Sequence, residues 1–256
     1  MIEVIEHWFQ DYVAGFQSPD GKLSPMQQLK LEHSRRVHDC AAEIVAELGW
    51  SPDQTLHAQT AALLHDIGRF PQYQEYGTYQ DGVSLNHGIK GADILRGWRT
   101  RFREEGLSLE RILPAVEFHN RPALPEGLAS EEESLLRLVR DADKLDIFEV
   151  VHDGATHPES LYTELTTWVD MQAPVSEAVL ECARERRPIR YADIHSLGDM
   201  LVAQLSWVYD LNYPPSFRIM RRRNTFSRLR ALIPVENDDT GPILERANRY
   251  LERQST

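Results

Sequence analysis

The stretch AALLHDIGRF, residues 61–70, places two strongly polar side chains at the end of an apolar helical segment. His65 and Asp66 follow a run of alanine and leucine and precede Ile67 and Gly68, so the pattern predicts that both are buried. Burying an imidazole and a carboxylate is costly unless each finds a strong partner, and a metal ion is the strongest available. The alternative is a helix-end histidine that hydrogen-bonds the neighbouring aspartate.

Helical periodicity dominates the chain on both sides of this stretch. Ser51 and Pro52 have the character of an N-cap and a first helical residue, so one helix is expected from Pro52 to the His65-Asp66 pair, with Gly68 as its stop. Because no run of residues alternates convincingly between apolar and polar, the fold class is predicted to be all-α. Further helices are expected over residues 29–48, 86–95, 109–119 and from 130 to about 150.

Two segments between these helices are expected to be irregular, residues 71–84 and 120–130, because both are rich in proline and glycine. The first contains Tyr73, Tyr76 and Tyr79. These tyrosines either pack on the surface or stack on a bound base as part of a lid, and the sequence leaves both alternatives open.

The chain after Gly154 again follows a helical pattern, with Trp168, Leu180 and Leu201 among its expected core residues. No repeat, low-complexity segment or linker interrupts it. We therefore expect residues 1–256 to form a single all-helical domain with a C-terminal helical extension over about 155–256.

Composition narrows the class of protein. The 256 residues carry a net charge of −12, which argues against nonspecific binding to nucleic acid. The first residues hold acids where a secretory signal would hold lysine or arginine, and no apolar run approaches the roughly 18 residues that a membrane span needs. Cys40 and Cys182 fit neither a disulfide framework nor a zinc ribbon. We expect a cytoplasmic protein with no membrane partner, and a homo-oligomer stays open.

One stretch, residues 218–230, departs from the acidic composition. Its arginines indicate a solvated helix face or a subunit contact, and a role in phosphate recognition stays open. The arginines are Arg218, Arg221, Arg222, Arg223, Arg228 and Arg230.

Other polar residues interrupt apolar helical stripes as His65 does. Asp143 falls in the stripe of the helix that begins near residue 130, and an aspartate there needs an arginine, several amide donors or a metal. His33 lies between Leu29 and Val37, and His119 follows Val116 by three residues. Each histidine alone is more often a satisfied core residue than a ligand. The His-Asp pair is equally uninformative alone, since it also occurs at residues 38–39 and 152–153, so the inference depends on the ordered set: His33, His65-Asp66, His87, His119 and Asp143.

This order resembles that of the HD-domain superfamily, in which a histidine, an adjacent His-Asp pair and a later aspartate bind a divalent metal on a helical bundle. ALLHDIGRF (62–70) is similar to the hallmark helix end, and DADKLDI (141–147) to the helix that carries the last aspartate. LNHGIKGADIL (85–95) and FHN (118–120) resemble the segments in which two-metal members place two further histidines. The resemblance covers about residues 28–150 and implies an HD-domain helical bundle.

Carried onto this sequence, the resemblance implies two divalent metal ions per chain. Nitrogen and oxygen ligands of this kind suit Fe, Mn, Co, Ni or Zn. Two such ions roughly 3.5–4 Å apart can share a hydroxide that attacks a phosphoryl group, so Asp66, as the bridging ligand, would also be catalytic. The implied ligands are His33, His65, Asp66 and Asp143 for the first ion, and Asp66, His87 and His119 for the second.

A phosphate group also needs cationic side chains to neutralise its charge. Arg69 lies one helical turn past His65, and Lys90 and Lys144 lie beside expected ligands, so these three are the candidates. Each could equally be a surface cation. For Arg69 the specific alternative is an ion pair with an acid such as Glu75 that anchors the tyrosine segment.

The resemblance implies a metal-dependent phosphohydrolase, a phosphomonoesterase or phosphodiesterase whose partner is a nucleotide or another small phosphorylated substrate. The absence of a Gly-Tyr-Pro signature after His87 disfavours the cyclic-dinucleotide phosphodiesterases of the family, and His87 and His119 disfavour the four-ligand alarmone hydrolases. The family also contains diiron oxygenases with nearly the same ligands, many with a lysine where this chain has Arg69. A third alternative, a non-catalytic domain with a structural metal, fits less well because structural sites usually close with four ligands.

Overall fold

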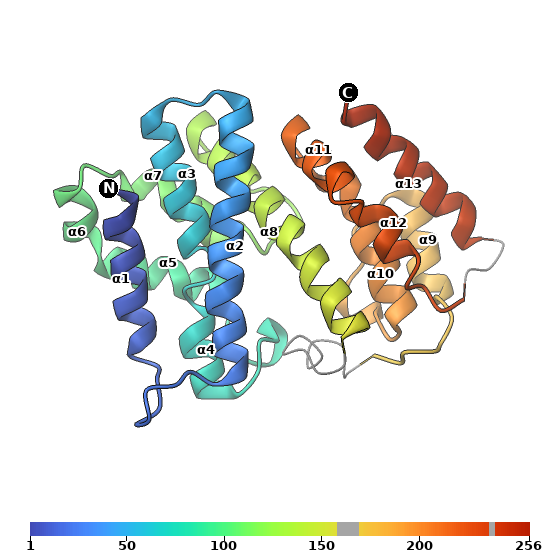
Figure 1. Cartoon of the computed structure of the whole chain (residues 1–256), viewed down its shortest axis with the longest axis horizontal. Coiled ribbons are helices and arrows are strands. Elements are labelled where there is room, and N and C mark those ends of the chain that lie inside the picture. The colour runs from blue at the N-terminus through green and yellow to red at the C-terminus, as the bar shows by residue number, and fades with distance from the viewer. Residues whose placement is uncertain (158–168, 236–238) are drawn as a thin grey trace. The chain divides into compact units, whose positions relative to one another are not determined.

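The computed structural model describes residues 1–157, 169–235 and 239–256, and its regular elements in these ranges are helices (Figure 1). Within the described residues, strand pairing is limited to one isolated bridge between Asp170 and Ser196, so the all-α fold class is confirmed. Among these residues, no helix combines the length and the apolar character needed to cross a membrane. The cytoplasmic location stays a prediction.

The chain divides into two compact units, residues 1–143 and 144–256. The expected C-terminal extension over about 155–256 is helical in its described parts, and Trp168, an expected core residue, lies outside them. That all 256 residues form one domain stays a prediction.

The first unit is built around α3 (Pro52–Leu64), which packs against α1 (Ile2–Ala14), α2 (Pro25–Leu48) and α7 (Leu109–Phe118). Most of the second half of α3 is buried, including Ala61, Ala62, Leu63 and Leu64, because apolar neighbours cover it on several sides. The unit also contains α4 (Arg69–Tyr76), the short 3-10 helix η1 (Asp81–Val83), α5 (His87–Gly97), α6 (Arg99–Glu104) and the first part of α8 (Ser130–Thr156).

Serine caps fix the starts of the two helices that enter the core. Ser24 and Gln27 form a capping box at α2, and Ser51 and Gln54 form one at α3, so each serine side chain accepts from a backbone N–H that would otherwise lack a partner. Gly49 ends α2 in the left-handed conformation, with φ of 65°. The end of α2 at Leu48 and the start of α3 at Pro52 agree with the sequence prediction, whereas α2 begins at Pro25, four residues before the expected start.

The prediction that residues 71–84 are irregular is wrong for the first part of that segment. Helix α4 continues to Tyr76 before Gly77 ends it. Pro71 does not prevent this, because it lies in the first turn of α4, where a missing N–H breaks no helical hydrogen bond.

Gly68 differs from its expected role as a helix stop. Helix α3 already ends at Leu64, and Gly68 has a φ of −70° and immediately precedes α4. A Cβ atom on Gly68 would lie 2.1 Å from the carbonyl oxygen of His87 and 2.8 Å from the backbone nitrogen of Gly91. Glycine is therefore required because the backbone of α5 passes directly against it.

Two glycines of α5 extend this close packing toward α7. A Cβ on Gly88 would lie 2.7 Å from the carbonyl oxygen of Glu117, and a Cβ on Gly91 would lie 3.0 Å from a methyl group of Val116. The small residues let α5 approach both α7 and the turn after α3. As a consequence, His87, the first residue of α5, comes close to the His65-Asp66 pair and to the end of α7.

The second unit is built around α10 (Leu197–Leu205), every residue of which is buried. Two arginines of the basic stretch form ion pairs within this unit, Arg228 with Glu149 at 2.7 Å and Arg221 with Glu252 at 3.4 Å. Helix α10 packs against α9 (Glu177–Glu185), η4 (Ser206–Asp210), α12 (Thr225–Arg230) and α13 (Thr240–Gln254), and the unit also contains the end of α8, η3 (Tyr191–Asp193) and α11 (Pro214–Arg222).

We expect Gly68→Ala to lower the free energy of unfolding by about 2–4 kcal/mol, because the added methyl group meets backbone atoms that no side-chain rotation can move away. Gly97→Ala, at the end of α5, is the matched control. Its Cβ would meet nothing within 4 Å, so that variant should be neutral or slightly stabilising. Urea denaturation of both variants measures the difference, and an equal effect of the two substitutions would contradict the packing argument.

Candidate metal centre

Six acidic and histidine side chains of the first unit converge on one buried space. Five of them are at most 6% exposed, and the side chain of the sixth, Asp143, is 17% exposed. They come from separate segments of the chain, so the fold and not local sequence brings them together. The six are His33 on α2, His65 and Asp66 just after α3, His87 at the start of α5, His119 just after α7 and Asp143 on α8.

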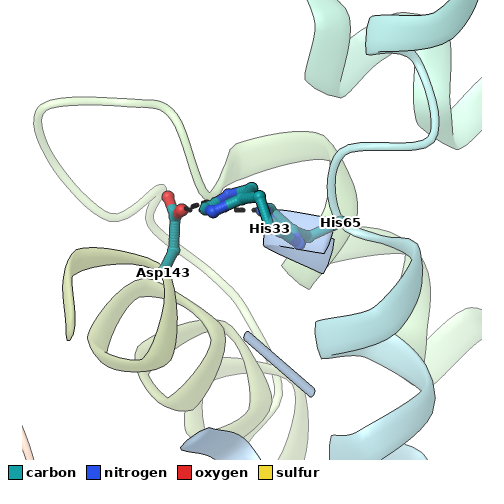
Figure 2. A group of neighbouring side chains, drawn as sticks. All are labelled: His33, His65 and Asp143. Carbon is teal, nitrogen blue, oxygen red and sulfur yellow. Dashed lines mark ion pairs between the residues drawn. The ribbon is translucent and has the colours of Figure 1, made fainter. Parts of the chain in front are cut away.

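One group of side chains surrounds the Oδ2 atom of Asp66 and the Oδ1 atom of Asp143. The Nε2 atom of His33 lies 3.1 Å from Asp143 Oδ1 and 3.6 Å from Asp66 Oδ2. The Nε2 atom of His65 lies 3.6 Å from both of these oxygens. Figure 2 shows the Asp143 carboxylate of α8 directed toward the imidazoles of His33 and His65. His33, His65 and Asp143 lie close enough to hold one metal ion, and so do His65, Asp66 and His119.

A second group faces the other oxygen of Asp66. The Nε2 atoms of His87 and His119 lie 3.3 Å and 3.6 Å from Asp66 Oδ1. They are also 3.0 Å from each other. Asp66 therefore has a pair of imidazoles on each of its two carboxylate oxygens.

Hydrogen bonds at the far side of the rings determine which nitrogen carries the proton. The Nδ1 atoms of His65 and His119 donate to the carbonyl oxygens of Ala62 and Val116, at 2.7 Å and 2.8 Å. The Nδ1 atom of His87 donates to Asp81, 2.7 Å away. Because a neutral imidazole has a single N–H, each Nε2 atom directs a lone pair into the cluster.

These inward lone pairs have no donor that satisfies them. His87 Nε2 and His119 Nε2 face each other, and His65 Nε2 is buried without a hydrogen-bond partner among the described residues. Lone pairs and carboxylates in contact repel one another, and a cation between them would turn the repulsion into attraction. The donor set therefore fits a divalent metal.

The protonation states agree with this requirement, since metal binding needs neutral imidazoles and ionised carboxylates. Burial lowers the pKa of His87 to about 3 and also lowers the pKa of His65. Burial raises the pKa of Asp66, but the nearby Lys30, His65 and Arg69 outweigh it and hold that pKa well below its usual value. At Asp143, burial raises the pKa, but the nearby His33 and His65 outweigh it and hold that pKa well below its usual value.

Asp81 is an important residue that the sequence did not single out. Its carboxylate accepts from the Nδ1 atom of His87 and from the side-chain amides of Gln72 and Asn120, both at 2.9 Å. Burial raises the pKa of Asp81, but the hydrogen bond from His87 and the charge of Arg69 lower it to about 2. A carboxylate in this position fixes the orientation and tautomer of a metal-ligating histidine. Asp81 lies in a segment without periodicity, so no sequence pattern marked it.

Lys30 is the second residue that the sequence analysis missed. Its ammonium nitrogen lies 2.7 Å from Asp66 Oδ2, and its side chain is 14% exposed. Lys30 precedes His33 by three residues on α2, so both lie on the same face of the helix. The three-residue spacing between Lys30 and His33 is the sequence feature that could have identified Lys30.

Arg69, a predicted phosphate-side cation, makes several contacts within the protein. Its Nε atom lies 3.3 Å from Asp66 Oδ1, and its Nη1 atom donates to Gln72, to Asp81 and to the carbonyl oxygen of Tyr79. These contacts connect the carboxylate of Asp66 to that of Asp81, which orients His87. The guanidinium also anchors the tyrosine segment, although through Tyr79 and Asp81 and not through Glu75.

The two predicted lysines have different surroundings. The ammonium group of Lys144 forms an ion pair with Asp210 at 2.9 Å, within the second unit. Lys90 is half-buried on α5, and its ammonium group forms no ion pair within the described parts of the chain. Lys144 thus has a counter-ion in the second unit, whereas Lys90, three residues from His87, has none among the described residues. Their catalytic roles stay predictions.

The three tyrosines of residues 71–84, of which Tyr73 and Tyr76 lie on α4 and Tyr79 follows it, divide into packed and exposed residues. Tyr79 donates its hydroxyl hydrogen to the carbonyl oxygen of Met26, and its ring lies 5.0 Å from that of Tyr73. The cationic groups of Lys30 and Arg69 each lie 5.5 Å from the centre of the Tyr79 ring. Tyr76 is 45% exposed. Tyr79 therefore packs beside the cluster and steadies the two cations.

Comparison with known proteins agrees with this geometry. The sequence profile of the HD domain family matches residues 31–147, a range that contains all six clustered residues, and the chain belongs to this family. HD domains bind divalent metals. The chain is 35% identical over 129 residues to a protein of Bacillus subtilis (strain 168) named "Putative phosphohydrolase YueE", a match that covers 48% of this chain and 71% of that protein. No solved structure matches the chain.

We expect Asp81→Asn to weaken metal binding by about 10- to 100-fold, the usual effect of losing the group that orients a ligating histidine. An amide keeps the shape of the side chain but removes the charge that holds both His87 and Arg69. Asp93→Asn is the matched control, because Asp93 lies on the exposed face of α5 and its partner is the surface residue Arg96. Competition with a chelator dye measures both affinities. Unchanged binding by the Asp81 variant would contradict the orienting role.

Proposed function

We propose that this chain is a metal-dependent phosphohydrolase that acts on a nucleotide or another small phosphate ester. One observation carries the proposal: each carboxylate oxygen of Asp66 faces its own pair of imidazole nitrogens. Membership of the HD-domain family and the name of the Bacillus subtilis relative support the reaction class.

The two groups around Asp66 support a site for two ions of the Fe, Mn, Co, Ni or Zn type. His33, His65 and Asp143 would complete the coordination of an ion on Oδ2, and His87 and His119 that of an ion on Oδ1. A structural site usually closes with four protein ligands, whereas this set exceeds four and shares a carboxylate. Sharing of that kind is typical of catalytic two-metal sites.

The charges of the site favour an anionic substrate. Three carboxylates, those of Asp66, Asp81 and Asp143, outnumber the two cationic side chains Lys30 and Arg69, so the metal-free site has one net negative charge. Two divalent ions would make the site strongly positive. A site with that charge in a mostly buried setting attracts phosphate much better than a neutral molecule.

When bound, such ions polarise phosphoryl oxygens and lower the pKa of water. The protein side chains position the ligands and contact the substrate. Asp66 holds the two groups of ligands at a fixed separation, and Asp81 keeps the lone pair of His87 directed inward. Arg69 connects both carboxylates, and its second amino group still has hydrogens to donate to a bound phosphate.

We expect close to two transition-metal ions per chain after purification in supplemented buffer. Asp66→Ala should lose both, because the two carboxylate oxygens of Asp66 face different pairs of imidazoles, whereas His119→Ala should keep the ion near His33 and His65. Elemental analysis of the three proteins gives the counts. One ion or fewer in the wild type after reconstitution, or an equal loss in both variants, would contradict this division of ligands.

We also expect the protein to release phosphate from a phosphomonoester or phosphodiester panel. Chelation should stop the release, and Mn²⁺, Co²⁺ or Ni²⁺ should restore it, because none of these reactions needs the metal to change its oxidation state. The assay is run with and without dioxygen. Turnover that requires ferrous iron and dioxygen, with no phosphate released, would replace this function by that of a diiron oxygenase.

A further inference from the structure

Lys30 has a position that differs from that of the other cations near the cluster. Its ammonium group touches Asp66 at 2.7 Å, and its side chain is 14% exposed, close to the 16% of Arg69 and well above the 3% of Asp66. The Lys30 side chain therefore keeps some contact with solvent beside a carboxylate that has almost none, as a group that meets an entering ligand needs.

The ammonium group has more hydrogens than acceptors. It carries three N–H bonds, and within the described residues its one hydrogen-bond acceptor is Asp66. The Tyr79 ring, whose centre is 5.5 Å away, supports the charge but accepts no conventional hydrogen bond. Arg69 makes more contacts within the protein, since its Nε and Nη1 atoms contact Asp66, Gln72, Asp81 and the Tyr79 carbonyl oxygen and leave its second amino group for a ligand.

A protonated lysine is not a metal ligand, because it has no lone pair to offer. A divalent cation on Asp66 would repel the ammonium group and compete with it for the same oxygen. The stable arrangement of two cationic groups so close together has an anion between them. A lysine that has no role with a ligand would make metal binding weaker and bring no compensating contact.

We propose that Lys30 binds the phosphoryl group of the substrate and favours phosphate monoesters over diesters. This inference rests on the proposed phosphohydrolase function and deepens it. A monoester phosphate has three nonbridging oxygens and close to two negative charges, whereas a diester has two such oxygens and one charge. The monoester thus keeps an oxygen for the ammonium group beyond those that metal ions would take, and it gains more from an added positive charge.

Binding of inorganic phosphate to the Mn²⁺-loaded protein tests this assignment without relying on turnover. Lys30→Met removes the charge and keeps much of the length of the side chain. We expect its manganese content to equal that of the wild type and its Kd for phosphate, from calorimetry, to rise about ten- to hundredfold, as for the loss of one charge-assisted hydrogen bond. Lys22→Met, in which a lysine with a 79% exposed side chain is lost, controls for the change in net charge and should bind phosphate normally.

The monoester preference gives a second measurement. The ratio of kcat/KM for 4-nitrophenyl phosphate to that for bis(4-nitrophenyl) phosphate should fall at least tenfold in Lys30→Met and stay unchanged in Lys22→Met. If Lys30→Met does not fold, Lys30→Gln, which can still donate to Asp66, carries the same expectations.

The outcomes separate this proposal from the function on which it rests. Wild-type protein that binds phosphate, together with a Lys30 variant that binds it within twofold as tightly, overturns the role of Lys30 and leaves the phosphohydrolase standing. A Lys30 variant that loses manganese overturns it as well, because Lys30 would then serve only to hold Asp66. A Mn²⁺-loaded wild type that neither binds phosphate nor releases it from any ester overturns both.

Discussion

Electrostatic repulsion around Asp66 is the constraint to which the rest of the first unit responds. The carboxylate is almost fully buried and is surrounded by imidazole nitrogens whose lone pairs point toward it. Such a group destabilises a fold unless cations offset it, because a buried charge without a partner is among the most costly features of a protein. Lys30 and Arg69 provide two positive charges in the metal-free protein, and a metal ion would provide the remainder.

Several of these repelling groups lie at the ends of helices of the first unit, and the helix ends fix their positions. His65 and His119 each follow the last residue of a helix, and each ring donates to a carbonyl oxygen of its own last turn. Arg140 on α8 adds to this by donating to the carbonyl oxygen of His119 and to that of Arg121. The tight approach of α5 at Gly68 and Gly88 fixes His87 opposite. The backbone thus orients each ring before any ligand arrives, as precise metal geometry demands.

The parts of the site that were predictable from sequence are those that break an apolar pattern. His33, His65, Asp66 and Asp143 each occupy a position at which the helical period calls for an apolar residue. The helix starts were predictable for a similar reason, because Ser51-Pro52 has a local chemistry with few alternative interpretations.

The residues that were missed act through long-range contacts. Asp81 reaches His87 from a segment without periodicity, and Lys30 looks like an ordinary surface lysine until the fold places it beside Asp66. Gly68 shows the same limit in the backbone: its expected role as a helix stop is a local inference, whereas its actual role depends on a helix that begins nineteen residues later, at His87. Helical periodicity reports which face of a helix is buried, but it carries no information about what lies opposite.

This arrangement couples metal binding to the stability of the fold. Folding brings the repelling groups together, so part of the free energy gained by helix packing offsets that repulsion. A bound cation removes the repulsion and thereby raises the free energy of unfolding. The coupling is strongest at the turn of residues 65–68, where the ligands and the tight contact with α5 occupy the same few residues. Arg69, the next residue, connects Asp66 to Asp81 and through it to His87, so the same contacts that hold the turn also hold a ligand from the opposite helix. A change at this turn therefore alters packing and metal affinity together, whereas a change at Lys30, on α2, alters charge and leaves the packing of the turn in place.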